Sequence, residues 1–252
     1  MKTPRETLLL GFETHSTETI QAALNAGADV NGLIGGRTPF TWLLEMYMRS
    51  PKFSDCVRCL IQAGAQCPDA GLLAVLLDDE KMIEAQLRAD PSLLQRTVNI
   101  RSAFTPLYGA ALLHVAAEYG LARAAAVLLK AGANPEAKAA VDDDGFNGHT
   151  PIFHTVCQRV NHSQPVLRLL LAHGAKPDVR VAGITWGKTF EWATTIFDAT
   201  PMSYAQAGLL PQFGRAERDV YENITLLAQA SGRALPKELN VPNRYLQPSR
   251  KG

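Results

Sequence analysis

The chain has 252 residues, of which 46% are apolar and 19% are charged, an ordinary composition for a globular protein with a sizeable core. With 25 basic and 24 acidic side chains the formal net charge is +1, so no overall field attracts nucleic acid or an anionic membrane. No stretch approaches the ~20 apolar residues of a membrane span, and the start lacks the apolar region of a signal peptide. We therefore expect a cytoplasmic protein without nucleic-acid or membrane partners, whose four cysteines are reduced.

A short motif of small residues recurs along the chain. It reads LNAGADVN (24–31), IQAGAQCP (61–68), LKAGANPE (129–136) and LAHGAKPD (171–178), and each copy ends a run with helical apolar spacing. The long interval between the second and third copies has room for one more unit, MIEAQLRADPSLL (82–94), where Asp90 replaces the glycine. A helix that ends in a left-handed turn is predicted at each place.

Thr-Pro pairs are predicted to open helices at GRTPFTWLL (36–44), GHTPIFHTV (148–156) and DATPMSYAQ (198–206), with a weaker start at AALLHVAAEYG (110–120). The threonine hydroxyl can cap free amides at a helix start, and proline there has its φ preset and no N–H to lose. The order of Thr-Pro, short helix, turn, second helix and Ala-Gly-Ala resembles the ankyrin repeat, whose period is about 33 residues. Segment 111–135 matches best, with Leu113, His114, Ala116 and Ala117 at positions where the family prefers these types.

The resemblance implies an all-α ankyrin solenoid of about six helix-turn-helix repeats with long finger insertions. The repeats are placed near 4–31, 36–66, 68–94, 110–136, 148–178 and 198–231, within a repeat domain of residues 1–231. Residues 232–252 are expected to form an extended C-terminal tail, because they hold three prolines and show no periodicity. In this family the fingers and first helices line a concave face that binds partner proteins, and a histidine at the position of His114 makes structural hydrogen bonds.

Four insertions distinguish this chain from a plain repeat array. They are 46–55, 95–109, 138–148 and, longest, VRVAGITWGKTFEWATTIFD (179–198). The last is rich in β-formers, so it has the composition of a β-hairpin turning near Gly187 and Lys188. Such a hairpin would place Trp186, Phe190 and Trp192 largely on one face, either as a cover for the last repeat interface or as a patch for a partner.

We expect recognition of a partner protein, by a monomer without catalysis, cofactor or metal. Aromatic and charged residues dominate interface energetics, so the expected contacts are Trp186, Lys188, Phe190, Glu191, Trp192, Trp42, Phe146 and His149. If the finger is a recognition element, Trp186 and Trp192 should be at least partly exposed. The alternative is an enzyme or small-molecule receptor that uses the aromatic segment 185–198 as a lid over the groove.

Two further groups of residues have the types that chemistry needs. Cys56 and Cys59 have the CxxC spacing of redox and metal sites, but they fall at apolar positions of a second repeat helix, which favours core packing. His149 and His154 flank a Thr-Pro start and, with nearby acidic residues, have the types needed for metal binding or acid-base work, although no fixed metal-site spacing supports this. The glycines of GLIGG (32–36) are interpreted as a finger tip and not as a phosphate loop.

Overall fold

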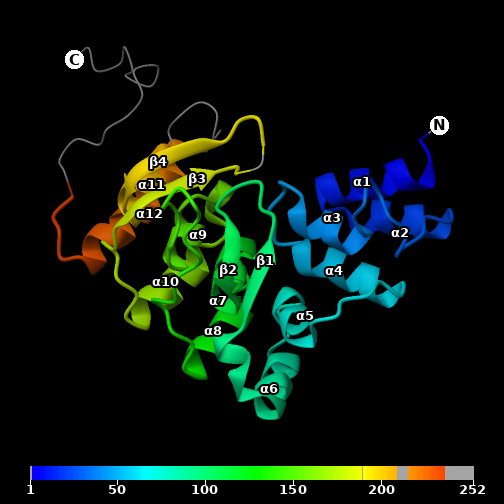
Figure 1. Ribbon diagram of the computed structural model, residues 1–252, viewed down its shortest axis with the longest axis horizontal. Helices are drawn as coiled ribbons and strands as arrows, with labels where there is room; N and C mark the ends of the chain where they lie inside the picture. The colour runs from blue at the N-terminus through cyan, green and yellow to red at the C-terminus, as the bar shows by residue number, and fades with distance from the viewer. Residues whose placement is uncertain (1, 189, 209–214, 236–252) are drawn as a thin grey trace.

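The computed structural model describes residues 2–188, 190–208 and 215–235, and within them twelve α-helices form consecutive pairs (Figure 1). Helices of neighbouring pairs pack side by side, as α2 does on α4, α5 on α7, α6 on α8, and α9 on α11. The pairs follow an arc from α1 and α2 at one end to α11 and α12 at the other. The helices are α1 (Pro4–Thr14), α2 (Thr17–Asn25), α3 (Pro39–Glu45), α4 (Phe53–Gln62), α5 (Ala70–Leu76), α6 (Glu80–Ala89), α7 (Leu112–Tyr119), α8 (Ala122–Lys130), α9 (Ile152–Val156), α10 (Gln164–Ala172), α11 (Pro201–Ala207) and α12 (Glu217–Ala230).

Threonine caps begin several of the first helices. The hydroxyl of Thr38 accepts a hydrogen bond from the Thr41 amide, and that of Thr200 accepts one from the Ser203 amide, each at 3.2 Å. These two caps were expected from the Thr-Pro pairs, and the following proline has no amide left unsatisfied. Thr150 is different, because its hydroxyl is buried without a hydrogen-bond partner and α9 has no side-chain cap.

The second helices end in one shared backbone geometry. Gly132 has φ of +95°, and the amide of Ala133 donates back to the carbonyl of Leu128 at 2.9 Å. This six-to-one hydrogen bond requires a left-handed residue, a conformation that glycine adopts without steric cost. Equivalent glycines with φ between 85° and 92° follow α2, α4 and α10. The left-handed turn predicted at Asp90 is wrong, because that residue is extended with φ of −145° and leads into the 3₁₀ helix η1 (Pro91–Gln95).

Two antiparallel hairpins correct the all-α expectation. The strands β3 (Val181–Trp186) and β4 (Thr194–Ala199) pair from Val181 with Ala199 to Trp186 with Thr194, so the hairpin expected in the longest insertion is present. The last pair of the ladder is Trp186 with Thr194, and the chain turns at Gly187 and Lys188, as expected. A second hairpin, β1 (Thr97–Ile100) with β2 (Leu107–Ala111), was not foreseen, because its strands are short and interrupted by an irregular register.

Backbone hydrogen bonds join the fingers into a row. The Ala140 amide donates to the carbonyl of Tyr108 in β2 at 2.8 Å, and the Asn147 amide donates to the carbonyl of Gly183 in β3 at 2.7 Å. The finger between α8 and α9 therefore bridges the two hairpins, and its own ends are held by a β-bridge between Val141 and Asn147. The row places β3 and β4 across the C-terminal half, with their tip directed toward the N-terminal helices (Figure 1).

The core runs through all helix pairs as one continuous cluster. Cys56 and Cys59 lie in α4 and are buried in this cluster, which confirms their placement at apolar positions of a second helix. No helix within the described ranges is long and apolar enough to cross a membrane. The tail expected over 232–252 lies, from residue 236 onward, outside the described residues.

Leu128 tests the shared core, because it is 1% exposed at the centre of the stack. Leu128→Ala should lower the free energy of unfolding by about 2–5 kcal/mol, through lost burial and a residual cavity. Leu33→Ala, at a finger position that is 67% exposed, is the matched control and should change it little. Urea unfolding followed by circular dichroism measures both, and equal losses would contradict this picture of the core.

Candidate functional site

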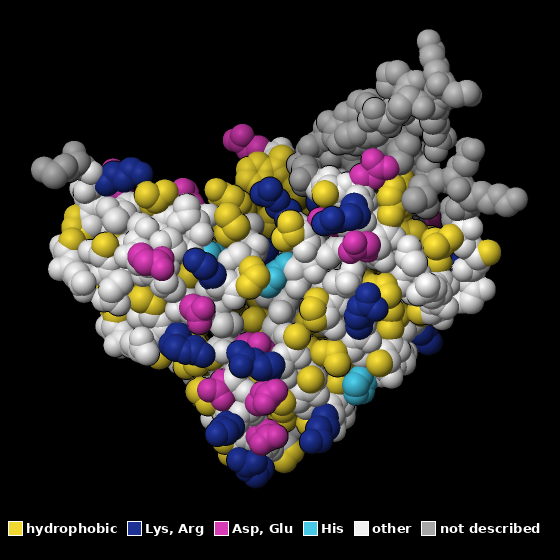
Figure 2. Space-filling model, turned by 180° about the vertical axis from the view of Figure 1, so that it is seen from behind, with side chains coloured by type: hydrophobic (Ala, Val, Ile, Leu, Met, Phe, Trp, Pro, Cys, Tyr) yellow, Lys and Arg dark blue, Asp and Glu magenta, His cyan; other side chains and the backbone are white. Residues whose placement is uncertain are grey.

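An aromatic groove lies between the N-terminal helices and the tip of the β3–β4 hairpin. Its volume is about 340 Å³, and α3 with the loop after it forms one wall. The opposite wall comes from the hairpin loop and from the segment between β1 and β2. Seen from the back in Figure 2, hydrophobic and basic side chains gather in the saddle between the two halves of the molecule. The lining residues of the aromatic groove are Arg37, Trp42, Glu45, Met46, Tyr47, Arg101, Ala103, Phe190 and Trp192.

Stacked rings and guanidinium groups define the chemistry of the aromatic groove. Phe190 and Trp192 stack with their ring centroids 4.3 Å apart, and Arg101 lies 4.3 Å from the Phe190 centroid. On the other wall Arg37 lies 4.9 Å from the Trp42 centroid and pairs with Glu45 at 3.2 Å. Cations over aromatic faces are attracted by the ring quadrupole and hold the ring orientations. The groove therefore presents rigid aromatic surfaces beside charged groups.

Several of the expected contact residues lie at or near this groove. Trp192 is 51% exposed, so the exposure expected of it is confirmed, and Glu191 beside it is also exposed. Trp42 is half-buried, and its indole N–H donates to the carbonyl of Ile34 at 2.6 Å. The structure thus brings Trp42, Phe190 and Trp192 into one groove, from segments far apart in the chain.

Two expected residues of the finger region point to other fingers. The Lys188 ammonium forms an ion pair with Asp142 in the finger between α8 and α9. Phe146, half-buried in the same finger, packs edge to face on Phe197 of β4 with centroids 5.5 Å apart. Neither residue lines the aromatic groove, and both connect the finger to the hairpin.

The exposure expected for Trp186 is wrong, because it is only 8% exposed. Alternate residues of a strand share a face, and Trp186 lies on the same inward face of β3 as the fully buried Ile184. Its ring packs against Phe104 with centroids 5.5 Å apart. The single shared face expected for Trp186, Phe190 and Trp192 is therefore split, because the last two lie in the hairpin loop and line the groove.

His149 was expected at the surface, and this is also wrong, because it is fully buried. Its Nε2 lies 3.1 Å from the carbonyl of Pro106 and 3.1 Å from Nε2 of His154. The His149 carbonyl accepts a hydrogen bond from Nε2 of His114 at 3.1 Å, in agreement with the structural role expected of His114. His149 thus belongs to an internal polar network that joins neighbouring repeats.

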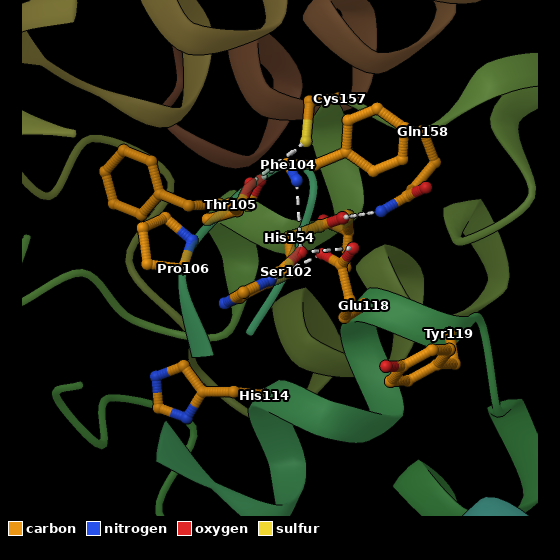
Figure 3. Close-up of polar contacts among 12 residues, drawn as sticks. Ser102, Phe104, Thr105, Pro106, His114, Glu118, Tyr119, His154, Cys157 and Gln158 are labelled. Carbon is orange, nitrogen blue, oxygen red and sulfur yellow. Dashed lines mark hydrogen bonds and ion pairs between the residues drawn. The ribbon is translucent and has the colours of Figure 1, made fainter. Parts of the chain in front are cut away.

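Glu118 is the centre of that network and was not identified from the sequence. Its carboxylate, on α7, pairs with Arg49 Nε at 2.9 Å and with His154 Nδ1 at 2.8 Å, and Ser102 Oγ lies 3.5 Å away. Figure 3 shows Ser102 and His154 gathered on Glu118, with His114 apart on the same helix. Arg49 also donates to the carbonyls of Met46 and Met48 and lies 4.6 Å from the Tyr119 ring centroid. No local spacing signals this cluster, because its members come from separate segments.

Burial sets the protonation states of the network. It lowers the pKa of His114 and of His154 to about 3, and the charge of Arg49 adds to the effect on His154. It also lowers the pKa of His149 well below its usual value. Burial raises the pKa of Glu118, and Arg49 opposes this rise by stabilising the carboxylate. The three histidines are therefore neutral at pH 7, and no cluster of metal-ligating side chains that could hold an ion occurs in the described part of the chain.

Helix pairs in an arc, with hydrogen-bonded finger hairpins on one side, define a helical repeat protein that presents fingers and a groove. The ankyrin repeat family model matches residues 105–140, which hold β2, α7, α8 and part of the following finger. This segment of the chain is thus similar to the ankyrin repeat, in agreement with the resemblance noted for residues 111–135. A search of curated proteins found no match.

The two hairpin tryptophans should separate stability from recognition. Trp186→Ala removes a buried ring and should lower the free energy of unfolding by about 3–5 kcal/mol. Trp192→Ala removes a half-exposed ring and should cost less than about 1 kcal/mol. Chemical unfolding of both variants beside the parent protein measures this difference. A similarly large loss of unfolding free energy in Trp192→Ala would show that the groove wall is part of the core.

The buried histidines should make the protein sensitive to mild acid. Unfolding exposes His114, His149 and His154, whose pKa then returns to about 6.5. Below pH 6.5 the unfolded chain binds protons that the folded chain does not bind, so stability falls as the pH drops toward the folded pKa of about 3 of His114 and His154. Each histidine contributes a slope of about 1.4 kcal/mol per pH unit.

His114→Gln provides the test, because glutamine keeps a donor for the carbonyl of His149. In urea titrations between pH 7.5 and 5.5, we expect the total acid-induced loss of stability over this range to be smaller in this variant by about 1.4 kcal/mol. His173→Gln, on the exposed face at the end of α10, is the control and should leave the slope unchanged. An unchanged slope in His114→Gln would contradict the neutral state assigned to this histidine.

Proposed function

We propose that the protein is a protein-interaction module of six stacked ankyrin repeats that binds a partner through the aromatic groove and the neighbouring fingers. The observation that carries the proposal is the half-exposed Trp192, stacked on Phe190 and facing Trp42 across a cavity of about 340 Å³. Buried aromatic anchors with a charged rim are the usual centre of binding energy at protein interfaces. Ankyrin repeats in general bind proteins, and this general property of the family also supports binding of a partner protein.

Preorganisation supports binding at this groove. The stacking of Phe190 on Trp192 and the position of Arg101 over Phe190 restrict the hairpin loop before a partner arrives. Gly187 fixes the base of the loop, because its amide donates to the carbonyl of Phe104 at 3.0 Å. Rings that are ordered in the free protein lose little conformational entropy on association. Trp42, Phe190 and Trp192 are the proposed anchors, and Glu191 is proposed to tune association rate and specificity.

We propose a monomeric cytoplasmic scaffold that acts without catalysis or a cofactor and does not bind nucleic acid. The balanced charge of +1 supports the last point. Of the expected contacts, Trp186 and His149 are buried and are proposed to act only by supporting the fingers, and Lys188 and Phe146 by holding the hairpin in place.

Affinity capture with groove variants tests the proposal. The intact protein, Trp192→Ala and Phe190→Ala are each used as bait, and captured proteins are identified by quantitative mass spectrometry. A genuine partner should be enriched on the parent protein and lost from both variants, since removing a hot-spot ring costs about 2 kcal/mol or more of affinity. Binding is then measured with the purified partner.

Leu235→Ala is the matched control, because Leu235 is also an exposed large apolar residue and does not line the aromatic groove. It should capture the same partner as the parent protein. All variants must first show the parent melting temperature, so that lost capture reports binding and not unfolding. A partner that binds both groove variants as tightly as the parent protein would overturn the proposed site.

A further inference from the structure

A second, smaller cavity lies next to the aromatic groove and shares Tyr47 with it. Its volume is about 190 Å³, and it is bounded by the loop after α3, the segment between β1 and β2, the end of α9 and the last residue of β3. Tyr47, Phe104 and Trp186 supply aromatic walls, and Arg49, Gln158 and Arg159 supply the polar groups. In Figure 3 Gln158 and Cys157 lie together beside Phe104, above Glu118.

The size of this cavity suits a small organic molecule. An apolar cavity of about 150 Å³ holds a benzene molecule, so about 190 Å³ accommodates one ring with a substituent. The rings of Phe104 and Trp186, 5.5 Å apart and tilted by 37°, present apolar surface to such a ring.

The charged side chains that line the cavity are basic. Two guanidinium groups line it, and among the described residues neither an aspartate nor a glutamate does, although Glu118 pairs with Arg49 from behind the wall. Arg49 is 7% exposed, and its Nε and Nη1 are engaged by Glu118 and by backbone carbonyls, while Nη2 makes only a long contact of 3.5 Å to Ser102. Arg159 is exposed on the rim. Guanidinium groups bind carboxylates through paired hydrogen bonds, so the cavity is complementary to an anion.

The cavity is equipped for binding and not for covalent chemistry. Cys157 lies in its wall, but burial raises the pKa of this thiol to about 11, so the reactive thiolate is scarce at pH 7. The Cys157 thiol also lies 3.3 Å from the hydroxyl of Thr105, in turn 2.9 Å from the hydroxyl of Tyr204. Gln158 is buried, and its amide donates to the carbonyl of His154 at 3.3 Å.

We propose that this cavity binds a small planar carboxylate, with the ring packed against the exposed sides of Phe104 and Trp186 and the carboxylate between Arg49 and Arg159. The inference is independent of the partner-binding groove, because the hairpin turns Trp186 toward the cavity and Phe190 with Trp192 toward the groove. The ligand would lie against residues 47–49 and Phe104, and Tyr47 of this set also lines the aromatic groove.

Three probes of equal size and different charge test the proposal. Benzoate, benzamide and benzamidine are titrated onto the intact protein, with binding followed by saturation-transfer NMR and by thermal unfolding. Benzoate should bind saturably with a dissociation constant of about 1–10 mM, as expected of a ligand this small. Benzamidine should bind at least about tenfold more weakly, because the nearby guanidinium groups repel it. No binding, or equal binding of all three probes, would overturn the proposal.

Arg159→Glu links the binding to this cavity, because the exposed position tolerates the change without unfolding. It should weaken benzoate at least about tenfold and reduce the preference over benzamidine. Arg168→Glu, an equally exposed arginine on α10, is the matched control and should leave benzoate binding as in the parent protein. Trp192→Ala should also leave it unchanged, and equal loss in Arg159→Glu and Arg168→Glu would show only diffuse attraction and overturn the assigned site.

Discussion

The Glu118 carboxylate lies in the interior of the stack and meets partners from three other segments. Arg49 comes from the loop after α3, Ser102 from the connection between β1 and β2, and His154 from α9. Removing the carboxylate would leave the Arg49 charge buried without compensation, a cost of several kcal/mol. The pair therefore constrains where the two connecting segments lie against the helices, whatever its net contribution to stability.

Both cavities depend on this constraint. The aromatic groove and the smaller cavity share Tyr47, and both are bounded by residues next to Arg49 and Ser102. The β3–β4 hairpin separates them, because strand alternation turns Trp186 inward while the loop carries Phe190 and Trp192 outward. Its position follows from backbone hydrogen bonds along the row of fingers, of which those of Ala140 and Asn147 join it to the preceding hairpin. The buried Glu118 network thus fixes the segments that line both cavities at the surface.

Local signals in the sequence were read correctly where the interaction itself is local. The caps at Thr38 and Thr200 each bind an amide three residues further along the chain. The turn at Gly132 is closed by the hydrogen bond from the Ala133 amide to the Leu128 carbonyl, five residues back. The β-rich composition of 179–198 predicted a hairpin that the structure contains. Two features were not predicted correctly. Thr150 is buried and makes no capping hydrogen bond, and the strands of the β1–β2 hairpin are too short and irregular to show an alternating pattern in the sequence.

The sequence by itself determined the helix pairs, the left-handed turns at the four recurring glycines and the ankyrin character of the centre of the chain, because each rests on contacts within one repeat. It also predicted partner contacts among the aromatic residues of the last insertion, of which Phe190 and Trp192 line the aromatic groove. Only the tertiary structure decided that Trp186 and His149 are buried and that Glu118 joins Arg49 and His154, which are 69 and 36 residues away from it. Burial of a charged or aromatic side chain depends on what other segments bring to it, and no spacing along one segment encodes that.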